Sequence, residues 1–193
     1  MLRLSLLVLL SMLSTWGWTQ SLVVSTHPIY LIAKEVTDGV EEPVLLLGDQ
    51  TGHDVQLTPA HRKAIQDASL VLWLGKVHEA PLDKLLSQNR KAIALLDSGI
   101  LTTLPQRNLR GAALSNTVDS HVWLYPNNAV RIAFFIATLR SQQYPENKAK
   151  YLANAKDFAQ QMLQASQQYE SSSKSKPYWS YHDAYQYLER ALN

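Results

Sequence analysis

The fold is indicated most clearly by residues 58–75, which read TPAHRKAIQDASLVLWLG. Thr58 supplies a hydroxyl suited to capping a helix, and Pro59 suits the first helical position, so we expect a helix from here to about Ala68. The apolar run at residues 70–75 predicts a buried strand. A helix that leads directly into an uninterrupted apolar strand is typical of a parallel sheet with helices on its faces.

The same alternation of apolar runs and helical patterns continues on both sides of this stretch. Further strands are expected at residues 22–26, 44–47, 92–96 and 178–181. Further helices are expected at residues 29–38, 80–88, 126–139, 145–168 and 183–192. A long loop separates them at residues 98–120. The sequence therefore predicts an α/β fold in which helices cover both faces of a parallel sheet.

The N-terminus has the pattern of an export signal. Arg3 provides a positive charge, and residues 4–13 are apolar except for two serines. A run of this length matches a secretory signal and is much shorter than the roughly 20 residues that span a bilayer. We therefore expect residues 1–20 to be a signal peptide and the mature chain to lie in the periplasm; a buried N-terminal helix is the alternative.

Composition excludes several classes of protein. The chain has 193 residues, 46% of them hydrophobic, which is too many for a disordered protein. Its formal net charge is only +2 and no basic run occurs, so nucleic-acid binding is not expected. The absence of cysteine excludes disulfides, thiolate metal sites and a lipid anchor on cysteine. A metal site would have to use His, Asp and Glu.

Three of the six histidines stand near the expected ends of strands or apolar runs: His53, His121 and His182. Ligands of doubly wound sheets bind beyond the carboxyl ends of the strands, so this is where a site is expected. Taken singly, a histidine is more often a surface or hydrogen-bonded residue than a metal ligand. The residues alone leave the function open.

The sequence segments around these histidines resemble motifs of the zinc-binding solute-binding proteins of ABC importers. Residues 52–59, GHDVQLTP, resemble the motif HDYxLxP, and residues 120–126, SHVWLYP, resemble HxWLxP. Residues 181–187, YHDAYQY, resemble FHDAYxYF, and residues 68–75 and 38–40 also have counterparts. The motifs occur in the family's order and cover essentially the whole mature chain.

The resemblance implies that His53, His121 and His182 are metal ligands. A third imidazole favours Zn²⁺, because manganese-binding members tend to have a carboxylate at the position of His182. Asp54 and Asp183 adjoin ligands and are candidate acceptors for their free ring N–H groups.

The other histidines have weaker assignments. His27 is a candidate auxiliary residue, because it ends the first strand. His61 is expected to be exposed, and His78 to have a capping or surface role.

The resemblance also implies a domain division. We expect an N-terminal lobe at residues 21–142, a connecting helix and linker at 143–176, and the first strand and helix of a second lobe at 177–193, with roughly 100 residues of that lobe lacking. So short a segment cannot bury its own core. Its apolar side chains would have to pack on the first lobe, bind a partner or remain mobile; they are Tyr181, Tyr185, Leu188 and Leu192. We expect His53 and His121 to form a two-histidine site to which His182 is added as a weakly held third ligand.

The expected function is capture of Zn²⁺ in the periplasm by a monomer that does no chemistry and presents the ion to an ABC permease of the inner membrane. The short second lobe argues against docking on the permease, and the loop at 98–120, with Asp119 as its one acid and no histidine, argues against metal collection by that loop. The alternatives are a metal buffer or non-transporting remnant, a manganese-binding homologue, and a zinc hydrolase. The sequence lacks the HExxH and GxSxG motifs of hydrolases, which argues against the last alternative.

Overall fold

A computed structural model describes residues 21–48, 50, 55–172 and 178–192. The expected export signal at residues 1–20 lies outside this part of the chain, as do the candidate ligand His53 and the neighbouring Asp54.

The centre of the protein is a parallel sheet of four strands in the order β2-β1-β3-β4. The strands are β1 Leu22–Val24, β2 Val44–Leu45, β3 Leu70–Trp73 and β4 Ala92–Ala94. Val23 pairs with Val44 on one side and with Val71 on the other, and Val71 pairs in turn with Ala92. Every residue of the two central strands is buried, which is why they read as continuous apolar runs. The predicted parallel sheet is confirmed.

Helices connect and cover the strands. They are α1 His27–Thr37, α2 Pro59–Asp67, α3 Asp83–Leu86, α4 Pro126–Gln143, α5 Lys148–Ser172 and α6 Gln186–Leu192. Short 3₁₀ turns are η1 Ala80–Leu82, η2 Leu95–Asp97, η3 Val122–Leu124 and η4 Pro145–Asn147. Within the described ranges, none of the helices combines the length and the apolar character that crossing a membrane requires.

The start of α2 follows the sequence prediction. The Thr58 hydroxyl accepts a bond from the backbone N–H of His61 at 3.3 Å, and Nδ1 of His61 accepts one from the N–H of Thr58 at 3.2 Å. Pro59 occupies the first turn. Such reciprocal capping satisfies donors that the helix itself leaves free.

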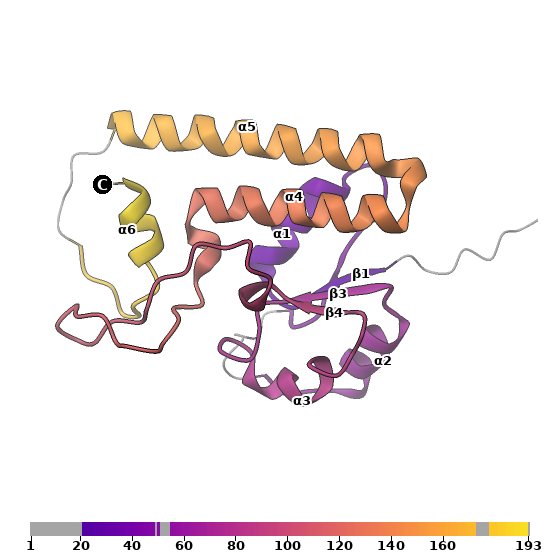
Figure 1. Cartoon of the computed structure of the whole chain (residues 1–193), viewed down its shortest axis with the longest axis horizontal. Coiled ribbons are helices and arrows are strands. Elements are labelled where there is room, and N and C mark those ends of the chain that lie inside the picture. Colours follow the sequence, from indigo (N-terminus) through magenta and orange to yellow (C-terminus); the bar gives the residue numbers. More distant parts are fainter. Residues whose placement is uncertain (1–20, 49, 51–54, 173–177, 193) are drawn as a thin grey trace, which may run out of the picture.

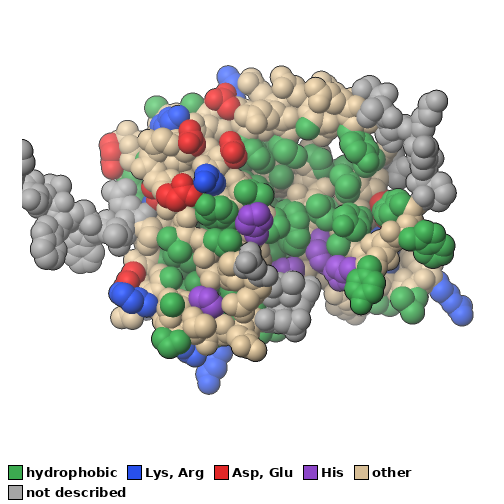
Figure 2. All heavy atoms as spheres, turned by 180° about the vertical axis from the view of Figure 1, so that it is seen from behind, with side chains coloured by type: hydrophobic (Ala, Val, Ile, Leu, Met, Phe, Trp, Pro, Cys, Tyr) green, Lys and Arg blue, Asp and Glu red, His purple; other side chains and the backbone are tan. Residues whose placement is uncertain are grey.

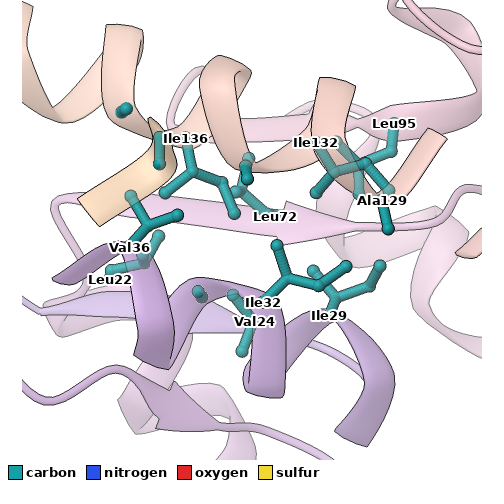
Figure 3. Close-up of a cluster of buried hydrophobic side chains, with 14 of the residues drawn as sticks. Leu22, Val24, Ile29, Ile32, Val36, Leu72, Leu95, Ala129, Ile132 and Ile136 are labelled. Atoms are coloured by element: carbon teal, nitrogen blue, oxygen red, sulfur yellow. The ribbon is translucent and has the colours of Figure 1, made fainter. Parts of the chain in front are cut away.

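Two apolar cores lie on opposite faces of the sheet, because successive side chains of a strand point to opposite sides. Leu22, Val24 and Leu72 face α1 and α4, where Ile29, Ile132 and other side chains interlock with them (Figure 3). Val23, Val71 and Trp73 face the other way, toward α2 and α3. Figure 1 shows this layering, with α5 outermost beyond α4. Helices on both faces were predicted and are confirmed.

Several predicted elements differ from the structure in their bounds, and three of the differences matter most here. The strand expected at 178–181 is wrong: residues 178–185 contain no strand, since an extended segment needs a neighbouring strand to satisfy its N–H and C=O groups. The helix expected at 80–88 divides into η1 and the single turn of α3. The last helix begins at Gln186, three residues later than expected, so His182 lies in a bend that precedes it.

Candidate metal site

His121 and His182 meet although 61 residues separate them in the chain. Their Nε2 atoms are 3.1 Å apart and their ring centroids 4.9 Å apart. His121 immediately precedes η3, and His182 lies in the bend before α6. Histidine side chains gather on one face of the molecule beside large hydrophobic ones (Figure 2). The tertiary fold thus brings together two of the three predicted ligands.

This meeting point lies beyond the carboxyl end of β3. The loop that follows β3 carries His78, whose Nδ1 is 2.8 Å from the hydroxyl of Ser120. The His78 ring is perpendicular to that of His121, with centroids 5.9 Å apart. The site therefore stands at the edge of the sheet where parallel α/β proteins bind ligands, as expected.

His78 itself differs from its expected capping or surface role. It is buried, with 6% of its surface exposed, and its ring packs edge-on against Trp123 at 5.5 Å between centroids. The ring of Trp123 also contacts His121 at 5.4 Å. The position of His78 shortly after the end of β3 could have indicated that it lies near the site. The loop after a buried central strand leads to the edge of the sheet where ligands bind.

The buried carboxylate of Asp119 fixes the orientation of His121. Oδ1 of Asp119 lies 2.6 Å from Nδ1 of His121 and accepts the backbone N–H of the same residue at 3.0 Å. Burial raises the pKa of Asp119, but the bonds from His121 and from the Gln186 amide outweigh it and lower the pKa below its ordinary value. An ionised carboxylate only accepts, so Nδ1 of His121 carries the proton and the lone pair of the neutral ring is on Nε2, the atom that faces His182.

Sequence reasoning recorded Asp119 as a loop acid and missed this role. The available signal was its spacing of two residues before His121, which lets one carboxylate bond both the ring and the backbone of the histidine. Metal-binding histidines very commonly donate their second ring nitrogen to such an acceptor.

The segment that carries His182 is anchored by residues other than those predicted. Tyr187 is fully buried; its hydroxyl donates to the carbonyl of Asp119 and accepts the N–H of Leu104, both at 2.8 Å. Gln186 donates to the carbonyl of Pro105 at 2.9 Å. Gln186 and Tyr187 are the buried residues of α6.

The apolar residues predicted to pack there are less buried. Tyr181 and Tyr185 are exposed, and Leu188 and Leu192 are half-buried. Hydrogen bonds from the start of α6 to the loop at residues 98–120 hold the helix that follows His182, and the weak attachment expected for His182 itself stays a prediction.

The remaining candidates occupy other places. Asp183 bonds with both Nε and Nη2 of Arg107, and its expected role as an acceptor for a ligand ring stays a prediction. His27 is exposed at the start of α1 and stacks on Tyr30 at 6.1 Å between centroids, so its auxiliary role stays a prediction. His61 caps α2 and is half-buried. In the part of the chain that the structure describes, no three His, Asp or Glu side chains form a group able to hold a metal ion.

A buried carboxylate, Glu79, shapes the loop between β3 and the site. Its Oε2 accepts the backbone N–H groups of Leu74 at 2.7 Å and Gly75 at 3.2 Å. Burial raises the pKa of Glu79 to about 7, against the opposing influence of Ser25, Gly75 and Leu74.

The variant Glu79→Gln is expected to flatten the pH dependence of folding stability. The pKa rises from 4.5 to about 7 on folding. The carboxyl therefore contributes stability that is complete below about pH 4.5 and is lost as pH rises through about 7, a change of about 3 kcal/mol. Urea unfolding of both proteins between about pH 5 and about pH 8 measures it. Parallel pH profiles for the two proteins would contradict this origin.

Comparisons with known proteins agree with the motifs and the fold. The family described as zinc-uptake complex component A, periplasmic, matches residues 22–193. The high-affinity zinc uptake system protein ZnuA of Brucella abortus is 28% identical over 216 residues, covering 90% of this chain and 65% of the relative. The protein of the same name from Yersinia pestis is 31% identical over 196 residues, covering 88% and 62%. The chain thus spans less than two thirds of the length of these relatives.

Solved structures share the architecture. The AdcAII protein of Streptococcus pneumoniae superposes with a TM-score of 0.72 at 23% identity, over 91% of this chain and 66% of its own. The zinc-bound ZnuA-like domain of AdcA from the same organism gives a TM-score of 0.71 at 23% identity, over 90% and 64%. At these identities the likeness establishes the fold.

Proposed function

We propose, from the premise that this chain belongs to the zinc-uptake complex component A family, that it captures Zn²⁺ in the periplasm as the cargo of an ABC importer. Its role is to bind the ion and present it to a permease of the inner membrane, with no chemical change of the cargo.

The observation that carries this proposal is the approach of two imidazole nitrogens. Two nitrogen ligands, each 2.0–2.1 Å from a tetrahedral zinc ion, are roughly 3.3 Å apart. The Nε2 atoms of His121 and His182 are 3.1 Å apart, so a small separation of the rings admits the ion between them. The Asp119 carboxylate supports this by keeping the lone pair of His121 on Nε2.

His53 is the proposed third ligand, and water or a carboxylate completes the tetrahedron. Imidazole nitrogens suit Zn²⁺ better than Mn²⁺, which prefers oxygen ligands. Asp54 and His27 remain candidates for auxiliary roles.

Titration of the purified protein with Zn²⁺ in competition with a chelator tests the binding. We expect one ion per chain, weaker binding of Mn²⁺, and affinity that falls in acid, because imidazole must be deprotonated to coordinate. Zinc affinity unchanged by His182→Ala would contradict the three-ligand site. Expression of the chain in a zinc-uptake mutant tests delivery: restored growth at low zinc supports transport, whereas binding without rescue indicates a buffer.

The variant Asp119→Asn is expected to weaken zinc binding about 10- to 100-fold, the usual effect of removing a ligand's supporting carboxylate. The amide keeps the size of the side chain but loses the charge that stabilises the Nδ1 proton of His121. Asp67→Asn is the matched control, because Asp67 is an exposed carboxylate on α2 that pairs with Lys63. Equal zinc affinities for the two variants would refute the role of Asp119.

A further inference from the structure

One guanidinium joins two carboxylates beside the histidine site. Nε of Arg107 donates to Oδ2 of Asp183 at 3.0 Å, and its Nη2 bonds the second oxygen of the same carboxylate. Nη1 of Arg107 donates to Oε2 of Glu189 at 2.6 Å. We call these three residues the clasp.

The clasp connects the two chain segments that carry the histidines. Arg107 lies in the loop at residues 98–120, which leads directly into His121. Asp183 is the residue after His182, and Glu189 lies in α6. Arg107 is 76 residues from Asp183 and 82 from Glu189, so the clasp is a purely tertiary contact.

The geometry of the clasp restricts the bend that holds His182. A planar guanidinium that bonds both oxygens of one carboxylate fixes direction as well as distance. The hydroxyl of Tyr178, which precedes the bend in the chain, donates a hydrogen bond to Glu189. The hydrogen bond from Arg107 lowers the pKa of Glu189, which keeps this second carboxylate charged.

The bend has little apolar packing of its own. Trp179 and Tyr181 are fully exposed, in contrast to the buried Gln186 and Tyr187 of α6. The contacts of Gln186 and Tyr187 hold the helix, and the Arg107–Asp183 pair holds the residues directly beside His182.

We infer that Arg107 is a positioning residue for the zinc ligand His182: it seats the bend so that the imidazole faces His121. This inference rests on the proposed zinc-binding function. Without the clasp His182 occupies its place for a smaller part of the time, and apparent affinity falls by that fraction. Arg107 is 25% exposed, so water screens the pair and the expected loss is about three- to tenfold.

A double-mutant cycle on the full chain tests the inference. Zinc affinity is measured by chelator competition for the variants Arg107→Ala, Arg107→Lys and Arg110→Ala, each alone and combined with His182→Ala. Arg110→Ala is the charge-matched control, since Arg110 is an exposed residue of the same loop and forms no ion pair within the described part of the chain. Arg107→Lys keeps the charge but loses the bidentate geometry, so its affinity should be intermediate.

A positioning role predicts that Arg107→Ala weakens binding only while His182 is present, and that the double variant equals His182→Ala. Amide exchange of residues 178–185 in the metal-free protein should accelerate in Arg107→Ala and not in Arg110→Ala. Asp183→Asn gives a second route to the same loss if Arg107→Ala folds poorly.

Equal loss of affinity in the wild-type and His182→Ala backgrounds would overturn the inference, as would wild-type affinity in both Arg107→Ala and Asp183→Asn. Either result leaves the zinc site standing if His121→Ala and His182→Ala still weaken binding. Failure of the unaltered chain to bind zinc would instead overturn the proposed function.

Discussion

Replacing His121 with alanine is expected to weaken zinc binding by more than about 100-fold, since loss of a ligand exceeds the 10- to 100-fold effect of losing a ligand's supporting partner. The variant removes the imidazole whose Nε2 lies 3.1 Å from that of His182. It also leaves the Asp119 carboxylate without the ring that accounts for one of its hydrogen bonds. Chelator competition with the purified variant measures the effect.

The matched control is His61→Ala, which removes an imidazole that serves to cap α2. It is expected to lower the stability of that helix by about 1 kcal/mol and to leave zinc affinity unchanged. Unfolding midpoints measured without metal separate folding effects from binding effects. If the two variants bound zinc equally, the imidazole of His121 would not be a ligand.

Replacing Glu41 with alanine is expected to destabilise the folded protein by about 3–5 kcal/mol, because it removes the carboxylate that balances the buried charge of Arg140. Glu41 accepts bonds from Nε of Arg140 at 2.7 Å and from its Nη2 at 2.5 Å, and Arg140 is fully buried. The hydroxyl of Tyr151 in α5 donates to the same carboxylate at 2.9 Å. Arg140 also donates to the hydroxyl of Ser69, just before β3, at 3.0 Å. The network therefore ties α4 and α5 to the connections between the strands.

Urea unfolding at neutral pH measures this loss. Glu42→Ala is the control, because the neighbouring Glu42 is an exposed carboxylate that pairs with Lys34 at 3.3 Å and should matter far less. The double variant Glu41→Ala, Arg140→Met should recover part of the stability, since it also removes the buried charge of the Arg140 guanidinium. If Glu41→Ala cost no more than Glu42→Ala, the network would not have the role assigned to it.

Several features of the fold were predictable because their causes are local. The apolar runs of β1 and β3 reflect burial on both faces of a sheet, and Thr58 with Pro59 marks the start of α2. The segment at 178–181 has the aromatic composition of a strand, but no strand of the described residues pairs with it. Its conformation depends on a partner that local composition does not specify.

The candidate site likewise has some residues that the sequence could identify and others that it could not. His121 and His182 were identifiable from the motifs around them, and the structure brings their rings together. His78 and Arg107 were assigned lesser roles or none, because their importance arises from contacts across 42 and 76 residues of chain. Chemistry-bearing residues that act through such contacts have no distinctive neighbours in the sequence. Asp119 lies only two residues from His121, and its role was missed although that spacing was visible.

The order of residues by itself determined the layers of this protein: which segments are apolar enough to be central strands, where helices begin, and which imidazoles border them. Only the three-dimensional arrangement decided that α6 docks through Gln186 and Tyr187, that Arg107 reaches the residue beside His182, and that the rings of His121 and His182 face each other. The physical reason is one of range. Burial patterns and caps act over a few residues, whereas these hydrogen bonds and ion pairs exist only after distant segments have packed together.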